Sequence, residues 1–177
     1  MKKIRKIDDF NLHRNNIFAR ETSYKSIISI SAGTCGQACG AMGIADTIRN
    51  ELSKQNLLSK VKIKLTGCHG FCEAEPNIII YPEGYFYQKL KPEDSTEIIN
   101  ETIINKKVVE RLLYKDYKSK KRIAFERDIP FYKKQQRWVL GNNPFIDPSN
   151  IDDYIARGGY IALSKVLSGT ERDSIIE

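Results

Sequence analysis

All four cysteines of this 177-residue chain fall into two pairs with the same spacing, Cys35/Cys39 and Cys68/Cys72. Each pair directly follows a segment with a strand pattern, and a helical pattern lies between the two segments. In a strand–helix–strand unit the two strands run parallel, so the loops that follow them leave the sheet at the same edge. The sequence therefore predicts that the four thiols meet in one place, at the edge of an α/β layer.

The other segments extend this layer. Strand, helix, strand, hairpin and helix patterns follow one another along the first part of the chain (25–31, 39–55, 61–66, 77–89 and 92–104). Two short helices are expected further on, around 151–156 and 160–167. We expect four parts: a polar N-terminal arm (1–24), an α/β domain (25–105), a basic linker (106–130) and an incomplete, mainly helical second module (131–177).

Several chemistries compete for the cysteines. A structural zinc ion usually takes pairs with two or four intervening residues, and a thioredoxin-type dithiol requires two, whereas these pairs have three. Disulfides need an oxidising compartment, and the N-terminus lacks the pattern of a secretory signal. A cluster held by four thiolates, Cys35, Cys39, Cys68 and Cys72, is therefore the favoured interpretation, and a two-iron cluster suits two loop pairs better than a four-iron one.

Residues around the cysteines support thiolate ligation. Cys39 is expected in the first turn of a helix, whose N-terminus would favour its thiolate. His69 lies inside the second pair, but a Rieske centre needs two histidines on one iron and His13 belongs to the N-terminal arm. We therefore expect His69 to be an exposed loop residue. Glycines that could donate N–H groups to sulfur flank both pairs (Gly33, Gly36, Gly40, Gly67 and Gly70).

The charge of the chain is concentrated in one segment. The net charge is +7, with 29 Lys and Arg against 22 Asp and Glu. Twelve of the basic and four of the acidic residues lie between Lys106 and Arg137, so the rest of the chain is almost neutral. Lys118 to Arg122 is the densest part, and we interpret the segment as a solvated linker rather than a nucleic-acid-binding arm. No apolar run is long enough to cross a membrane, so we expect a cytoplasmic protein with no membrane insertion, or one peripheral to a membrane complex.

Two motifs resemble a known family. They read Gly-Thr-Cys-Gly-Gln-Ala-Cys-Gly-Ala at 33–41 and Gly-Cys-His-Gly-Phe-Cys-Glu-Ala-Glu-Pro at 67–76. Both are similar to the thioredoxin-like [2Fe-2S] ferredoxin domain, in the form fused to the front of the NADH-binding flavoprotein subunit of NADH dehydrogenases and NAD(P)-reducing hydrogenases. The segments at 129–143 and 147–163 resemble the part that leads into the flavin domain of that subunit.

This resemblance implies a thioredoxin-like fold and a one-electron relay, working with other iron–sulfur and flavin subunits of an NADH:acceptor oxidoreductase. FMN, NAD(H) and a [4Fe-4S] cluster would belong to the remainder of such a subunit, so the chain is expected to be a fragment or a split gene product without catalytic residues of its own. Thioredoxin-like folds commonly carry a cis-proline at the position of Pro76, and cis and trans are equal alternatives here.

Two other classes of function stay open. One is a zinc-stapled binding module whose basic arm, around Lys118 to Arg122, contacts nucleic acid. The other is a scaffold that docks other subunits through the helical pair at Gly158-Gly159 and has no redox role.

Overall fold

A computed structural model of the chain describes residues 4–171 and 173–175. The chain forms two compact units. One spans Tyr24–Asp147 and contains all four cysteines, and the other combines Met1–Ser23 with Pro148–Glu177. Among the residues described, no helix has the length and apolar character needed to span a membrane.

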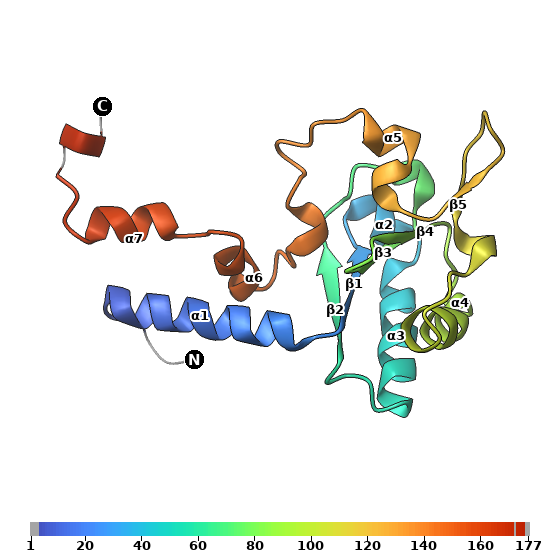
Figure 1. Cartoon of the computed structure of the whole chain (residues 1–177), viewed down its shortest axis with the longest axis horizontal. Helices are drawn as coiled ribbons and strands as arrows, with labels where there is room; N and C mark the ends of the chain where they lie inside the picture. The colour runs from blue at the N-terminus through green and yellow to red at the C-terminus, as the bar shows by residue number, and fades with distance from the viewer. Residues whose placement is uncertain (1–3, 172, 176–177) are drawn as a thin grey trace. The chain divides into compact units, whose positions relative to one another are not determined.

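The cysteine-bearing unit is built on a four-stranded sheet with the order β2-β1-β3-β4 (Figure 1). β1 and β2 pair in parallel, with Ser31 opposite Thr66 at their ends, whereas β3 runs antiparallel to both of its neighbours. The predicted parallel pair and hairpin are thus confirmed, and the loops after β1 and β2 leave the sheet at one edge. The strands span Ser26–Ser31 (β1), Val61–Thr66 (β2), Ile78–Tyr81 (β3) and Tyr85–Tyr87 (β4).

Helix α3 (Ala41–Lys54) connects β1 to β2 and contributes one face to the core. The residues that recur at helical spacing are the buried ones, as the sequence predicts (Ala41, Ile44, Ala45, Ile48 and Leu52). The helix starts later than predicted, because Gly40 takes a left-handed conformation with φ of 97° and separates α3 from the short helix α2 (Thr34–Ala38).

The last predicted helix of the α/β domain is present but changes its winding. α4 (Asp94–Glu97) continues as a π-helix over Ile98–Ile104. As predicted, its inward residues Ile98, Ile99, Thr102 and Ile103 are buried. Short 3-10 helices complete the unit (Cys72–Ala74, Glu110–Leu112, Glu126–Asp128 and Asn143–Phe145).

The segment at 106–130 differs from the predicted linker. Val109, Leu112, Leu113 and Ile129 are buried, so apolar residues spaced between the basic ones anchor the segment to the core. Bridges join β4 to this segment and cover its outer edge, which would otherwise expose unpaired backbone groups (Tyr87 with Leu113, Tyr85 with Phe125). The lysines gather on a two-stranded hairpin, followed by helix α5 (β5, Tyr114–Lys115; β6, Arg122–Ile123; α5, Pro130–Lys133).

The second unit is helical. α1 (Ile7–Ser23) buries Phe10 and Ile17 against Ile155, so the predicted N-terminal arm is a helix with a packed face. Asp152 pairs with Arg20 at 2.6 Å and lies 3.0 Å from the His13 ring. The Arg20 hydrogen bond lowers the pKa of Asp152 below its usual range. The two predicted C-terminal helices are present, and a 3-10 turn follows (α6, Ile151–Ala156; α7, Ile161–Leu167; turn, Asp173–Ile175).

Candidate metal centre

The cysteines lie on two loops at the carboxyl ends of the parallel strands. Cys35 belongs to α2 after β1, and Cys39 directly follows that helix. Cys68 and Cys72 lie in the loop after β2. All four are free thiols; Cys68 is half-buried and the other three are exposed. The topology therefore brings both predicted pairs to one edge of the sheet.

Three of the thiols are neighbours. The Sγ atoms of Cys68 and Cys72 are 3.9 Å apart. A hydrogen bond with Cys35, followed by one with Cys68, raises the pKa of Cys72 to about 11. Proton loss from Cys72 is opposed because its thiolate would lie beside other thiols, and a bound cation reverses that preference. A positively charged group bound here would therefore favour loss of the thiol protons and create thiolate ligands.

Cys39 differs from the prediction that placed it in the first turn of a helix. It ends α2 instead, where its N–H donates to the carbonyl of Cys35 at 3.0 Å. Cys39 therefore lies between the two helices, one residue before Gly40, which caps the N-terminus of α3. In the described part of the chain, its thiol makes no hydrogen bond with the other cysteines, and no group of three His, Cys, Asp or Glu residues is placed to hold a metal ion. A two-iron cluster needs two thiolates on each iron, and Cys68 and Cys72 are two thiols close enough together to supply such a pair.

Gly33 and Gly70 have defined roles at the centre. A Cβ on Gly33 would lie 3.1 Å from both the Cβ and the N of Cys68, so a side chain here would press on the second loop. Gly70 has φ of 88°, a left-handed conformation that favours glycine, and its N–H donates to Cys68 Sγ at 3.2 Å. This bond is the predicted N–H···S contact, which stabilises charge on the sulfur.

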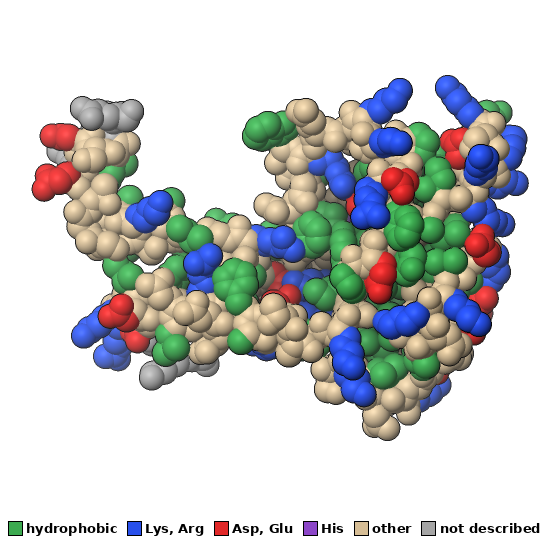
Figure 2. All heavy atoms as spheres, viewed as in Figure 1, with side chains coloured by type: hydrophobic (Ala, Val, Ile, Leu, Met, Phe, Trp, Pro, Cys, Tyr) green, Lys and Arg blue, Asp and Glu red, His purple; other side chains and the backbone are tan. Residues whose placement is uncertain are grey.

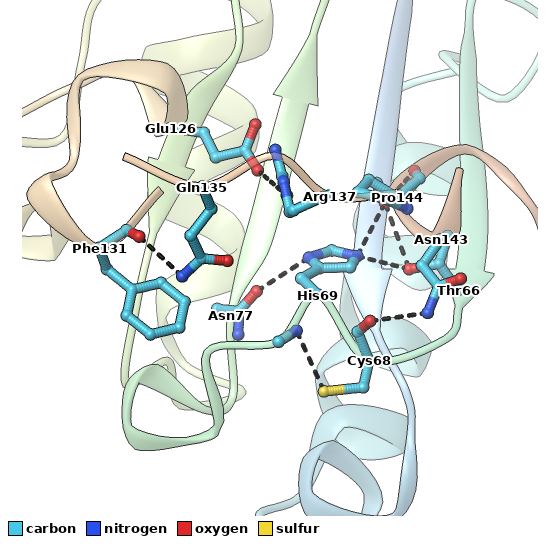
Figure 3. Close-up of polar contacts among 12 residues, drawn as sticks. Thr66, Cys68, His69, Asn77, Glu126, Phe131, Gln135, Arg137, Asn143 and Pro144 are labelled. Carbon is cyan, nitrogen blue, oxygen red and sulfur yellow. Dashed lines mark hydrogen bonds and ion pairs between the residues drawn. The ribbon is translucent and has the colours of Figure 1, made fainter. Parts of the chain in front are cut away.

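His69 is fully buried, so the prediction of an exposed loop residue is wrong. Its Nε2 lies 2.7 Å from Thr66 Oγ1, and its Nδ1 lies 3.2 Å from Asn77 Oδ1 (Figure 3). Burial lowers the pKa of His69 to about 4, against the smaller raising effect of the Asn77 hydrogen bond. The neutral ring therefore connects the loop between Cys68 and Cys72 to the ends of β2 and β3.

A second anchor comes from a distant part of the chain. The Asn143 amide donates to the carbonyl of Cys68 at 2.9 Å, and Ser29 donates to the carbonyl of Pro144 at 2.6 Å (Figure 3). The sequence predicts neither contact, because its pattern assigns residues from 131 onward to another module. No pattern in the nearby sequence predicts these contacts, because Asn143 lies 75 residues from Cys68 in the chain.

Aromatic packing holds the same loop from the other side. The Phe71 ring stacks on Phe131 with centroids 4.2 Å apart and meets Tyr132 edge-on at 5.8 Å. Phe71 is buried, whereas Cys72 beside it is exposed. The loop is therefore fixed by alternate residues while its thiols stay near the surface.

Glu75 links the loop to β1. Its buried carboxyl accepts hydrogen bonds from Ser31 Oγ and from the Asn77 N–H, the latter at 3.1 Å. Burial raises the pKa of Glu75 more than these bonds lower it. The Glu75–Pro76 peptide is cis, which answers the question that the sequence left open.

Comparison with known proteins agrees with this architecture. The family model described as thioredoxin-like [2Fe-2S] ferredoxin matches residues 15–103. A 2Fe-2S ferredoxin of Clostridium pasteurianum is 39% identical over 69 residues, covering 39% of this chain and 68% of that protein. A 2Fe-2S ferredoxin of Aquifex aeolicus (strain VF5) is 30% identical over 82 residues, covering 46% of this chain and 73% of that protein.

Two further likenesses are more limited. The NADP-reducing hydrogenase subunit HndC of Solidesulfovibrio fructosivorans is 51% identical over 43 residues, which are 24% of this chain and 9% of that protein. The solved structure of a thioredoxin-like [2Fe-2S] ferredoxin from Aquifex aeolicus superposes with a TM-score of 0.48 at 22% identity, covering 50% of this chain and 89% of that one. The family match spans half of the sequence and includes both cysteine pairs. The chain belongs to the thioredoxin-like [2Fe-2S] ferredoxin family.

Proposed function

We propose that Cys35, Cys39, Cys68 and Cys72 hold a [2Fe-2S] cluster and that the chain relays single electrons. One observation carries the proposal: thiols from both loops, Cys35 on one and Cys68 and Cys72 on the other, adjoin at one edge of the sheet. When bound, the cluster supplies a site that accepts and gives up one electron.

The residues of the chain fit this group. Cys68 and Cys72 provide two adjacent thiols, and the Gly70 N–H already donates to one of them. Cys35 lies near the same thiols, and Cys39 is four residues further along the same loop with its side chain exposed. The buried His69 and Phe71 fix the loop without supplying a ligand.

We further propose that the relay serves an NAD(P)-linked hydrogenase or a related NADH dehydrogenase. The identity with the HndC hydrogenase subunit supports this, although the matched part is 9% of that protein. In such a complex, FMN, NAD(P)H and a [4Fe-4S] cluster would be held outside the cysteine-bearing unit, with helices α6 and α7 leading toward the flavin domain.

Anaerobic reconstitution with iron and sulfide tests the proposal. We expect two irons and two sulfides per chain, a visible charge-transfer spectrum, and a paramagnetic signal after reduction by one electron. The Cys39→Ala variant tests whether the outlying thiol is a ligand, and the Thr34→Ala variant on the same exposed stretch is its control. A colourless chain that holds one zinc ion would contradict the proposal.

A further inference from the structure

The β5–β6 hairpin carries a patch of exposed positive charge beside the metal centre. Its lysines are Lys115, Lys118, Lys120 and Lys121, and all four are exposed. Figure 2 shows Lys and Arg side chains gathered on this side of the unit, over the hairpin. We call this surface the lysine hairpin, residues 114–123.

The positive charge of the lysine hairpin is not neutralised within the described residues. Asp116 is its one acidic residue, and hydrogen bonds from the Ser119 side chain and from the Ser119 N–H, the latter at 2.7 Å, lower the pKa of Asp116. The Lys120 ammonium lies 4.3 Å from the centre of the Tyr117 ring, and the Tyr117 side chain is 82% exposed. By contrast, Arg137 outside the hairpin pairs with Glu126 at 2.7 Å.

The root of the hairpin contacts the loop that bears Cys68 and Cys72. Tyr114 packs against Phe71, with ring centroids 5.7 Å apart. A cavity of about 360 Å³ lies between the two segments, lined by Phe71 and Glu73 on one side and by Lys115, Tyr117 and Lys120 on the other. A molecule bound in this cavity would therefore contact Phe71 and Glu73, the residues on either side of Cys72 in the chain.

We propose that the lysine hairpin is the docking surface for an acidic one-electron carrier protein; this rests on the proposed electron relay. Its position brings the redox group of a partner next to the cysteines. A small patch of positive charge attracts an acidic partner and raises its rate of association. Lysine ammonium groups are strongly hydrated point charges, which suits fast binding and release more than the fixed bidentate contacts of arginine. In each transfer one electron leaves the reduced carrier and one enters the chain, and no bond forms or breaks.

The test compares two variants with the same charge change. K118Q/K120Q/K121Q neutralises the tip of the hairpin. K25Q/K54Q/K60Q neutralises three exposed lysines around the starts of β1 and β2 and the end of α3, away from the cysteine edge. The probe is an acidic flavodoxin, and its affinity for the full chain is measured by titration calorimetry at low salt and at about 0.5 M salt.

We expect the hairpin variant to bind the flavodoxin about tenfold more weakly at low salt, with the difference disappearing at high salt, while the control variant stays within about twofold of wild type. Equal losses in the two variants would overturn the proposal. So would a hairpin variant that loses affinity for a single-stranded oligonucleotide but not for flavodoxin, since the surface would then serve nucleic acid.

A second measurement separates this proposal from the electron relay. Photoreduced deazaflavin is a small neutral reductant that needs no docking surface. If it reduces the reconstituted chain normally but wild-type chain does not bind flavodoxin, the docking proposal fails and the relay stands. If the chain assembles no reducible cluster yet binds flavodoxin through the hairpin, the proposed relay is wrong. The lysine hairpin would then bind an acidic protein without a role in electron transfer.

Discussion

The two cysteine-bearing loops leave the same edge of the sheet, yet they are held in different ways. The loop after β2 is fixed by the buried His69 and Phe71 and by the Asn143 amide. The loop after β1 exposes both of its cysteines, and the side chain of the exposed Gln37 donates to the carbonyl of Ala32 at 2.8 Å. We infer that the loop after β2 is a preformed half of the proposed centre and that the loop after β1 is an adjustable half.

This difference suggests an order of events in metal loading. A rigid pair of thiols needs little rearrangement to take up iron, whereas the exposed pair can turn to complete the site. Cys35 on one loop and Cys68 on the other both raise the pKa of Cys72, so this thiol links the two halves. Variants that remove ligands or anchors from one loop at a time test whether the two loops differ in this way.

The largest effect is expected from Cys72→Ala. Because alanine has no ligand atom and this thiol connects both loops, we expect the variant to retain almost no iron after reconstitution. Cys39→Ala should retain part of its iron with an altered visible spectrum, since the other three thiols stay in place. Iron and sulfide analysis with visible circular dichroism measures both. Equal retention in the two variants would remove the distinction between the loops.

The next effect concerns the anchor of the rigid loop. His69→Ala leaves a cavity and unpaired Thr66 and Asn77 groups in the core, so the free energy of unfolding should fall by about 4 kcal/mol. Gln37→Ala on the exposed loop is the control and should change it by less than about 0.5 kcal/mol. Urea unfolding of the metal-free chain gives both values. If His69→Gln folds normally and its reduction potential equals that of the wild type, His69 does not position the proposed ligands.

His69 also predicts a dependence of stability on pH. Its pKa falls from 6.5 to about 4 on folding, so between these values the unfolded chain binds more protons. The metal-free chain should therefore lose about 3 kcal/mol of stability as the pH falls from 7 to 4. Glu75, whose pKa is raised, acts in the opposite sense because its stabilisation is lost as the pH rises through that pKa. Unfolding of His69→Gln across this range isolates the histidine, and an unchanged slope would contradict its burial as a neutral ring.

The sequence predicts the local elements well, because their patterns depend on near neighbours. The alternation before Cys68 and the helical spacing from Ala41 to Leu52 are each readable within one segment. The burial of His69 cannot be predicted within one segment, because a glycine-flanked loop is usually exposed. The residues that cover this loop include Pro144, which lies far along the chain. The basic stretch at 106–130 misleads for a similar reason: its lysines dominate the composition, while Leu112 and Leu113 decide how it packs.

The smallest effect is expected from the distant contact between Asn143 and the loop after β2. Asn143→Ala removes one hydrogen bond to the carbonyl of Cys68 and should lower the free energy of unfolding by about 1 kcal/mol. The neighbouring Asn142 is exposed, so Asn142→Ala should change it by less than about 0.5 kcal/mol. Because the lost bond lies on the rigid loop, Asn143→Ala should also slow iron uptake, which the control variant should leave unchanged. Stability lost without slower uptake would mean that the loop after β2 does not need to be preformed to accept metal.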